Sequence, residues 1–375
     1  MRILTLFLSV LCLSLSVRAV DYPIDRLDQR TLPLNGVYNF TRTGSGVHTY
    51  VVDTIVRNTH AEFGGRSDIV YNPCNQNPLD PNPFWSHGTN VAGLLGSSSY
   101  GPATGAYIHS VAHCSVPPDY VNSIVTAANW ITANRIDPAV VVLSYNSRFF
   151  GADQVTAINN SIASGVTWIV SAGNDTADAC SQTQLDAIVV GSLYVDNGTE
   201  ILTNFTNYGS CVTLFAALGG TTTFNSSDTA VGGFTGTSAS APTVAGVVAL
   251  MREADPNASS ATIKQRLIDW STKGEISGNL NGSPNRIAYS LDTTISGKVT
   301  NTIGIPLPNI VVKLTNSNGV SRFATTSSFG LYSFENVIPY EDYTVSASSK
   351  RYKFAPHVFN DVTVSLANVD FVGLE

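Results

Sequence analysis

The sequence predicts an α/β fold with a mostly parallel twisted sheet and helices on both faces, followed by a small all-β sandwich domain. Between about residues 45 and 270, short runs rich in valine and isoleucine alternate with helical patterns, which is typical of a parallel sheet. The runs are apolar nearly throughout, as in strands that are buried on both faces. From Ile295 onward the helical period disappears and short alternating runs between turn residues indicate an antiparallel sandwich.

The individual elements follow from these runs. In the α/β part, strands are predicted at residues 48–53, 107–112, 139–145, 166–171 and 187–193. Helices are predicted at residues 87–95, 120–133, 153–164, 243–253 and 260–270. In the C-terminal part, strands are predicted at residues 295–299, 309–314, 322–326, 331–337, 343–348 and 362–366, with turn residues between them. Because the pattern changes near Asp292, we place the α/β domain at residues 20–291 and the sandwich domain at residues 292–375.

The N-terminus has the features of a secretory signal peptide. Arg2 supplies a positive charge, the apolar run at residues 3–17 is too short to span a bilayer comfortably, and a small-residue cleavage pattern ends at Ala19. We therefore expect a signal peptide at residues 1–19 and a secreted, extracellular mature chain. No later segment is apolar enough to span a membrane, so the mature chain is expected to have no membrane span.

Composition limits the classes of partner. The 375-residue chain has a formal net charge of −7, which gives no support to a nucleic-acid partner. Only 13% of the residues are charged, and Ser, Thr, Asn and Gly fill most polar positions, which suits a globular extracellular protein. We expect a monomer without a nucleic-acid partner.

The cysteines predict disulfides. Of the five cysteines, Cys12 lies in the predicted signal peptide, which leaves Cys74, Cys114, Cys180 and Cys211. An even number in an exported chain favours two disulfides, and the cysteines alone leave three pairings open. No two of the four have the spacing of zinc ligands, so no metal site is predicted.

Two polar residues stand at element ends, where a parallel sheet places its site. Asp53 follows an apolar strand, so its carboxylate is expected at the carboxyl edge of the sheet; the alternative is a turn or helix N-cap aspartate. His87 begins a helical run, where the helix dipole favours a neutral imidazole base, and Gly88 lets another backbone segment approach. The remaining histidines are interpreted as structural or surface residues: His48, His60, His109, His113 and His357.

Ser238 lies among small residues, in Gly-Thr-Ser-Ala-Ser-Ala-Pro at residues 236–242, just before the predicted helix at 243–253. These neighbours leave the hydroxyl open, and the helix N-terminus favours negative charge near it. A serine becomes a nucleophile when a histidine takes its proton and a carboxylate orients that histidine. The alternative is an N-cap serine without chemistry.

Asn174 closes the segment Val-Ser-Ala-Gly-Asn after a predicted strand. Its amide can donate to an oxyanion, as an asparagine does in subtilisin, or it can be a turn residue. The order Asp53, His87, Ser238 is the order of subtilisin and differs from those of chymotrypsin and the α/β-hydrolases. Together these residues predict a serine endopeptidase that acts on polypeptides through a Ser-His-Asp triad with an Asn-assisted oxyanion hole.

At these motifs the chain resembles the subtilase family, and within it the proteinase K and aqualysin branch. The likeness covers about residues 25–271 and is carried by the segments at residues 25–34, 59–66, 205–211 and 236–242. The resemblance implies that the substrate runs along the site as an additional strand. It also implies a cleft whose one wall is Ser144, Tyr145 and Asn146 and whose other wall is Ser171, Ala172 and Gly173.

The resemblance further selects the disulfide pairings Cys74–Cys114 and Cys180–Cys211. No cofactor is expected for the chemistry. A structural calcium ion is left open, because relatives carry a calcium-binding aspartate where this chain has Thr213. Two departures, Ile55 and Asn146 in place of family glycines, together with the short segment before Asp53, leave an alternative open: a catalytically impaired binding or scaffold protein.

The C-terminal part resembles the carboxypeptidase regulatory-like family of β-sandwiches. The likeness is carried by the segments at residues 295–299, 308–312 and 330–334. The resemblance implies no chemistry of its own for this domain, and it leaves substrate docking, surface attachment and stabilisation equally open.

Overall fold

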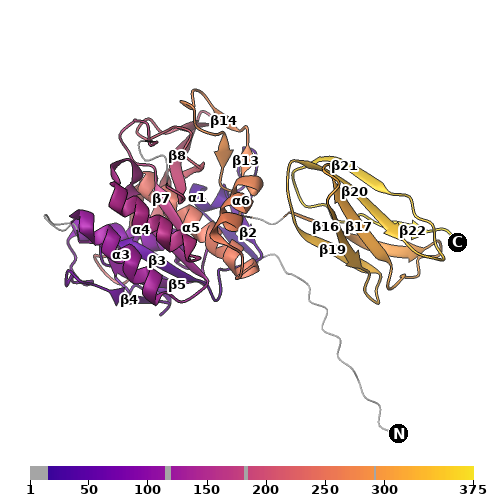
Figure 1. The fold of residues 1–375 in the computed structure, drawn as a ribbon, viewed down its shortest axis with the longest axis horizontal. Helices are drawn as coiled ribbons and strands as arrows, with labels where there is room; N and C mark the ends of the chain where they lie inside the picture. The colour runs from indigo at the N-terminus through magenta and orange to yellow at the C-terminus, as the bar shows by residue number, and fades with distance from the viewer. Residues whose placement is uncertain (1–15, 115–119, 181–184, 291–292) are drawn as a thin grey trace, which may run out of the picture. The chain divides into compact units, whose positions relative to one another are not determined.

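The computed structural model describes residues 16–114, 120–180, 185–290 and 293–375 (Figure 1). Most of the predicted signal peptide lies outside these residues. Contacts divide the chain into two compact units, Met1–Ser290 and Leu291–Glu375, which are described separately. Within the described ranges, none of the helices combines the length and the apolar character that a membrane crossing requires.

An eleven-stranded sheet forms the centre of the first unit. Its main path has the order β13-β15-β10-β8-β7-β6-β3-β5-β4, and every pair along it is parallel except β13–β15. The strands are β3 (His48–Asp53), β4 (Ser67–Tyr71), β5 (Tyr107–Ala112), β6 (Ala139–Asn146), β7 (Thr167–Ser171), β8 (Ile188–Asp196), β9 (Thr199–Leu202), β10 (Leu214–Ala217), β13 (Thr272–Lys273), β14 (Ile276–Ser277) and β15 (Arg286–Ile287). Smaller two-stranded pairs are formed by β1 (Ser16–Ala19) with β2 (Val37–Phe40) and by β11 (Gly219–Thr223) with β12 (Val231–Thr235).

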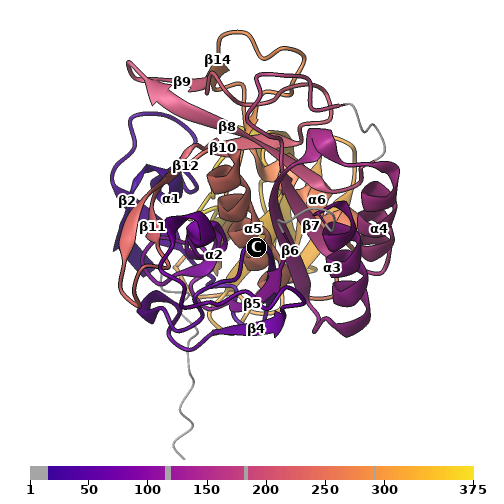
Figure 2. The same ribbon diagram turned by 90° about the vertical axis from the view of Figure 1, so that its left-hand side faces the viewer.

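Helices cover both faces of this sheet, as predicted (Figure 2). One apolar core joins the sheet to α2 (His87–Gly96), α5 (Thr237–Ala254) and α6 (Ser260–Trp270). The other core joins it to α3 (Tyr120–Asn134) and α4 (Ala152–Ala163). Strand β3 shows why both faces are apolar, because Val51 packs into the first core while Tyr50 and Val52 pack into the second. The short helix α1 (Tyr22–Asp25) and three single-turn 3₁₀ helices complete the unit: η1 (Ala61–Phe63), η2 (Pro83–Ser86) and η3 (Ser147–Phe149).

The strand order changes direction between β3 and β6. From β3 the chain continues to β4 and β5 on one side, and from β6 it continues to β7 and β8 on the other. In open α/β sheets, ligands bind outside the carboxyl ends of the strands at such a switch point. The carboxyl ends of β3 and β6 are Asp53 and Asn146, so the topology places the candidate residues at this crevice.

The second unit is an all-β sandwich, as predicted. A three-stranded sheet has the order β19-β16-β22, a four-stranded sheet has the order β18-β17-β20-β21, and one apolar core contains residues of both sheets. The strands are β16 (Thr293–Asn301), β17 (Val311–Asn316), β18 (Ser321–Thr325), β19 (Leu331–Val337), β20 (Glu341–Ser348), β21 (His357–Val362) and β22 (Phe371–Gly373). The predicted strand at residues 362–366 is wrong, because β21 ends at Val362 and Leu366 makes only an isolated bridge with Ile295.

Most predicted elements of the first unit are confirmed to within a few residues. The exception is the helix predicted at residues 243–253, which begins six residues earlier, at Thr237. The predicted helix started directly after Pro242, and a proline inside a helix removes a hydrogen bond. Pro242 nevertheless lies within α5, and a hydrogen bond from the Ser144 hydroxyl at the candidate site makes this possible.

Candidate active site

Asp53 and His87 form a hydrogen-bonded pair at the carboxyl end of β3. The Nδ1 atom of His87 lies 2.7 Å from Oδ1 and 2.8 Å from Oδ2 of Asp53. A carboxylate only accepts hydrogen bonds, so Nδ1 carries the proton and Nε2 of the neutral ring is left as a base. The Asp53 side chain is 6% exposed whereas that of His87 is 35% exposed, so the carboxylate is shielded while the imidazole reaches solvent.

Backbone contacts hold the two residues together. Thr54 donates its backbone N–H to Asp53 Oδ1 at 2.7 Å, and its hydroxyl accepts a hydrogen bond from the N–H of Gly88 at 2.8 Å. A Cβ atom on Gly88 would lie 1.9 Å from the carbonyl oxygen of Thr54, so the predicted close backbone approach at this glycine is confirmed. Ile55 is buried and its backbone N–H binds Gln76, so this departure from the family pattern coexists with the Asp53–His87 pair.

The pKa of His87 depends more on Asp53 than on its position at the helix start. Burial of the ring opposes the charged imidazolium, but the attraction of Asp53 and its hydrogen bond favour it more, and the pKa of His87 is raised above its usual value. The helix start favours the neutral imidazole, as expected, but its effect is smaller than that of Asp53. The carboxylate at hydrogen-bond distance outweighs the partial charge of the helix end.

Ser238 is the second residue of α5, not a residue before the helix. Its backbone carbonyl would normally accept a hydrogen bond from the residue four positions later, but Pro242 has no N–H. The hydroxyl of Ser144 donates to this carbonyl oxygen at 3.0 Å instead. A side chain from the end of β6 thus satisfies the group that the proline leaves unpaired, which explains how α5 continues through Pro242.

The structure brings Ser238 and His87 to the same edge of the sheet without joining them. The Ser238 hydroxyl donates to the carbonyl oxygen of Ser144 at 3.3 Å. Among the described residues, no hydrogen bond links Ser238 to His87. The His87 ring makes an edge-to-face contact with Phe234, at 5.2 Å between centroids, four residues before Ser238. Such a catalytic hydrogen bond is often long without substrate and tightens only in the complex.

Asn174 lies directly against the start of α5. Its Oδ1 atom accepts hydrogen bonds from the backbone N–H of Thr237 at 3.0 Å and from the Thr237 hydroxyl at 2.9 Å. Because a backbone N–H can only donate, the oxygen of the amide is fixed on the Thr237 side. The Nδ2 donor therefore lies on the other side of the amide, where a Cβ atom on Gly236, two residues before Ser238, would lie 3.4 Å from it.

The two predicted cleft walls also lie side by side. Ser171 donates its hydroxyl to the carbonyl oxygen of Tyr145 at 2.8 Å, which joins the ends of β7 and β6. Gly173 has a φ of +106°, and a Cβ atom there would lie 2.1 Å from Oδ1 of Asn146. Asn146 thus fills the space beside this glycine, and its amide donates to the Asp175 carboxylate. Of the predicted wall residues, Ala172 is fully buried and contributes its backbone.

The sequence prediction missed the role of Asn207. Its buried Nδ2 donates to the carbonyl oxygen of Ala172 at 2.9 Å, and its Oδ1 accepts from the backbone N–H groups of Asp175 and Ala177. The segment at residues 205–211 carried part of the family resemblance, but nothing local indicated a contact with residues 30 to 35 positions earlier. Asn207 therefore holds the backbone on both sides of Asn174, at Ala172 before it and at Asp175 and Ala177 after it.

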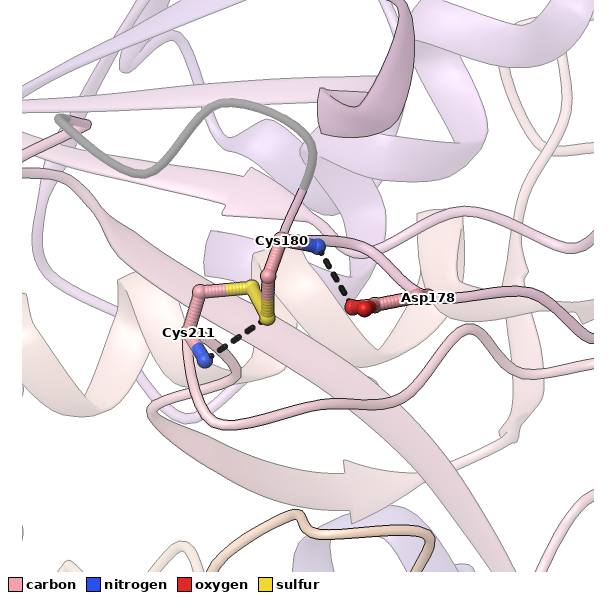
Figure 3. A group of neighbouring side chains, drawn as sticks. All are labelled: Asp178, Cys180 and Cys211. Carbon is pink, nitrogen blue, oxygen red and sulfur yellow. Dashed lines mark hydrogen bonds between the residues drawn. A yellow bond between two sulfur atoms is a disulfide. The ribbon is translucent and has the colours of Figure 1, made fainter.

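Two disulfides join Cys74 to Cys114 and Cys180 to Cys211, the pairing that the resemblance implies. Asp178 lies beside the second disulfide and accepts a hydrogen bond from the backbone N–H of Cys180 at 2.8 Å (Figure 3). Asp178, Cys180 and Cys211 are close enough together to resemble a metal cluster. Because the two sulfur atoms are bonded to each other, neither is a thiolate ligand.

The residues around Thr213 do not fit a calcium ion. The Thr213 hydroxyl oxygen accepts a hydrogen bond from the backbone N–H of Val189 at 3.1 Å. Nearby, the ammonium of Lys264 donates to the carbonyl oxygens of Asp186 and Ala187 at 3.0 and 2.9 Å. Calcium requires several oxygen ligands with carboxylates among them, and here a neutral hydroxyl and a cation stand instead.

Comparisons with known proteins agree with this geometry. Residues 44–288 match the subtilase family, and residues 294–372 match the carboxypeptidase regulatory-like domain. The extracellular serine proteinase of Thermus sp. (strain Rt41A) is 37% identical over 273 residues, which are 71% of this chain and 65% of that protein. The alkaline serine exoprotease A of Vibrio alginolyticus is 32% identical over 321 residues, which are 84% of this chain and 58% of that protein.

A crystal structure of a cold adapted subtilisin-like serine proteinase is also similar, with a TM-score of 0.65 and 32% identity, covering 73% of this chain and 99% of that chain. Fervidolysin from Fervidobacterium pennivorans, a keratinolytic enzyme related to subtilisin, shares the fold with a TM-score of 0.54 at 20% identity, covering 88% of this chain and 60% of that chain. The chain spans less than two thirds of the length of the two curated relatives. The match over residues 44–288 and these similarities show that the chain belongs to the subtilase family.

Proposed function

We propose that this chain is a secreted serine endopeptidase that hydrolyses peptide bonds with Ser238 as nucleophile, His87 as general base and Asp53 as the carboxylate that orients His87. The observation that supports this most is the Asp53–His87 pair, which leaves His87 Nε2 as a base at the edge of the sheet where α5 presents Ser238. Secretion is supported by the predicted signal peptide, the disulfides and the Thermus relative named as extracellular.

The proposed reaction begins when His87 Nε2 takes the proton of Ser238 and the serine oxygen attacks the peptide carbonyl carbon. The carbonyl oxygen becomes an oxyanion, which Nδ2 of Asn174 and the backbone N–H of Ser238 stabilise. This N–H is available because the first N–H groups of a helix have no partner within the helix, and Ser238 is the second residue of α5. His87 then gives its proton to the leaving amine, and water releases the acyl group from Ser238 by the same steps.

The polypeptide substrate is proposed to lie between the walls at residues 144–146 and 171–173 as an additional strand. The two walls lie at the carboxyl ends of β6 and β7, so their backbone groups stand at the carboxyl edge of the sheet. Backbone hydrogen bonds would hold the substrate, and side-chain pockets would select its residues. Because Asn146 occupies the space beside Gly173, it is proposed to limit the side chain accepted there.

A fluorophosphonate probe tests this function, because it reacts with a serine that its histidine has activated. We expect the purified chain to be labelled at Ser238, located by peptide mass spectrometry, and to cleave a peptide blocked at both termini, which an exopeptidase leaves intact. Folded protein that takes up no label at Ser238 would contradict the proposal and favour the binding or scaffold alternative.

Replacing Asn174 by alanine is expected to lower kcat by about 10² to 10³-fold, the effect of losing one oxyanion donor in subtilisin. The Michaelis constant should change little, because the oxyanion exists only after the attack. Steady-state kinetics on a blocked peptide measure both values. A raised KM at unchanged kcat would show that Asn174 binds the ground state and does not stabilise the oxyanion.

The pH profile follows from the raised pKa of His87. His87 must be neutral to accept the serine proton, so kcat/KM should increase as pH rises through its pKa. Because Asp53 raises that pKa, we expect the midpoint above about 6.5, the ordinary value for histidine. The measurement is kcat/KM of the parent between mildly acidic and alkaline pH; a midpoint below the ordinary value would contradict the proposed pair.

A further inference from the structure

A pocket of about 240 Å³ lies apart from the proposed catalytic residues. It is bounded by η3, by segments next to β8 and β10, by α6 and by β15, and it adjoins the disulfide end of Cys211. None of the proposed catalytic residues lines it. Thr213, the position at which relatives carry a calcium-binding aspartate, also lines this pocket.

Two cations line the pocket. Lys264 of α6 uses its Nζ for hydrogen bonds to two backbone carbonyl oxygens, so one of its three N–H donors remains. Arg286 of β15 is half-buried, and within the described ranges its guanidinium makes no side-chain hydrogen bond or ion pair. The lining residues in this part of the chain include no aspartate or glutamate. Among the described lining residues, the guanidinium of Arg286, with five N–H donors, therefore has no acidic counter-charge.

Three hydroxyl groups add further donors. Ser147 is 3% exposed, and among the described residues its Oγ has no hydrogen-bond partner. Leaving a buried hydroxyl unpaired is unfavourable, so this atom indicates a missing partner. The Thr213 oxygen accepts from Val189, which leaves its own proton free to be donated, and Ser210 also lines the pocket.

Lys273 of β13 stands directly opposite Arg286 in the antiparallel pair, which places two like charges next to each other. Burial lowers the pKa of Lys264, and the attraction of the exposed Asp186 raises it by a smaller amount. Asp178, the other nearby acid, is engaged with the backbone at Cys180. An added negative charge would therefore stabilise this region.

We propose that this pocket binds a small oxyanion, a phosphate or a carboxylate, through Arg286, Lys264 and the hydroxyl of Ser147. The described lining residues supply cationic and hydroxyl donors and no carboxylate, which suits an anion with several oxygen atoms better than a metal cation. The planar fork of Arg286 matches two oxygen atoms of such a group. The volume accommodates an anion of a few heavy atoms with bound water. This proposal does not depend on proteolytic activity.

The test uses the full chain with Ser238→Ala, so that self-cleavage cannot interfere and the result is independent of the proposed function. Titration calorimetry and thermal unfolding are measured with inorganic phosphate and with succinate, at ionic strength held constant with sodium chloride. We expect saturable binding and a melting temperature that rises with the concentration of the anion. The anion that binds more tightly shows whether the pocket prefers a phosphate or a carboxylate. Binding of neither would overturn the proposal.

Variants locate the site. Arg286→Gln should weaken the binding at least tenfold, whereas Lys313→Gln, which makes the same change in net charge in the C-terminal unit, should leave it unchanged. Ser147→Ala should also weaken binding while the free protein melts at the same or a higher temperature, since an unpaired buried hydroxyl is removed. Equal affinity for the parent, Arg286→Gln and Ser147→Ala proteins would overturn the proposal.

Discussion

Replacement of Ser238 by alanine is expected to lower kcat by about 10⁶-fold, the effect of removing the nucleophile or its base in subtilisin. The reason is that the other groups cannot replace a covalent nucleophile, although the oxyanion donors continue to stabilise the transition state. Fluorophosphonate labelling should disappear completely. The hydroxyl makes one long hydrogen bond, to the Ser144 carbonyl at 3.3 Å, so the melting temperature should hardly change. Labelling, kcat on a blocked peptide and thermal unfolding are the measurements.

Ser240 provides a matched control two residues along the same helix. Its side chain is fully buried and its hydroxyl donates to the carbonyl oxygen of Ala217 at 2.9 Å. Ser240→Ala should therefore keep its labelling and most of its kcat, while it loses about 1 kcal/mol of unfolding free energy with one buried hydrogen bond. If Ser238→Ala retained kcat within tenfold of the parent, the role of Ser238 as nucleophile would be wrong.

The parts of the fold that were predicted correctly depend on local patterns. The β3 strand was predicted because its residues are apolar on both faces, and Asp53 was placed at its end because a polar residue follows that run. Likewise His87 begins α2 where the helical period begins. These positions follow from periodicity, and the parallel order of the strands then brings them to one edge of the sheet.

The parts that were not predicted depend on contacts between distant segments. The start of α5 was placed after Pro242, whereas the structure continues the helix through this proline with the help of the Ser144 hydroxyl, which lies 94 residues earlier than Ser238. Asn207 supports the segment next to Asn174 through bonds that no periodicity reveals. The pKa of His87 was likewise set by Asp53, 34 residues away, rather than by the helix on which it lies. Such long-range pairs become visible only when the chain is folded.

Replacement of Asp53 by asparagine is expected to lower kcat by about 10⁴-fold, because the change puts the proton of His87 on the wrong nitrogen. The backbone N–H of Thr54 donates to Oδ1 of Asp53 at 2.7 Å, so the oxygen of the new amide must stay on that side. Its NH₂ group replaces Oδ2, which lies 2.8 Å from His87 Nδ1, whereas Oδ1 lies 2.7 Å from the same nitrogen. The new NH₂ donor therefore competes with Oδ1 for Nδ1, and when it donates there the imidazole proton moves to Nε2. The nitrogen that should accept the serine proton is no longer a base.

Nitrogen NMR of the imidazole identifies this tautomer directly, and kcat is measured at a pH where His87 is neutral. The pair of His109 with Asp68 offers the matched control, because His109 Nδ1 lies 2.6 Å from Asp68 Oδ1 on β5 and β4. Asp68→Asn makes the same chemical change in another histidine–aspartate pair and should leave kcat within a few-fold of the parent. An Asp53→Asn protein that is folded and keeps more than a tenth of the parent kcat would show that the orientation of His87 does not depend on the carboxylate. The proposed mechanism would then lose Asp53 as the residue that orients His87. If Asp68→Asn keeps its activity while Asp53→Asn loses it, the loss is due to the pair at the end of β3.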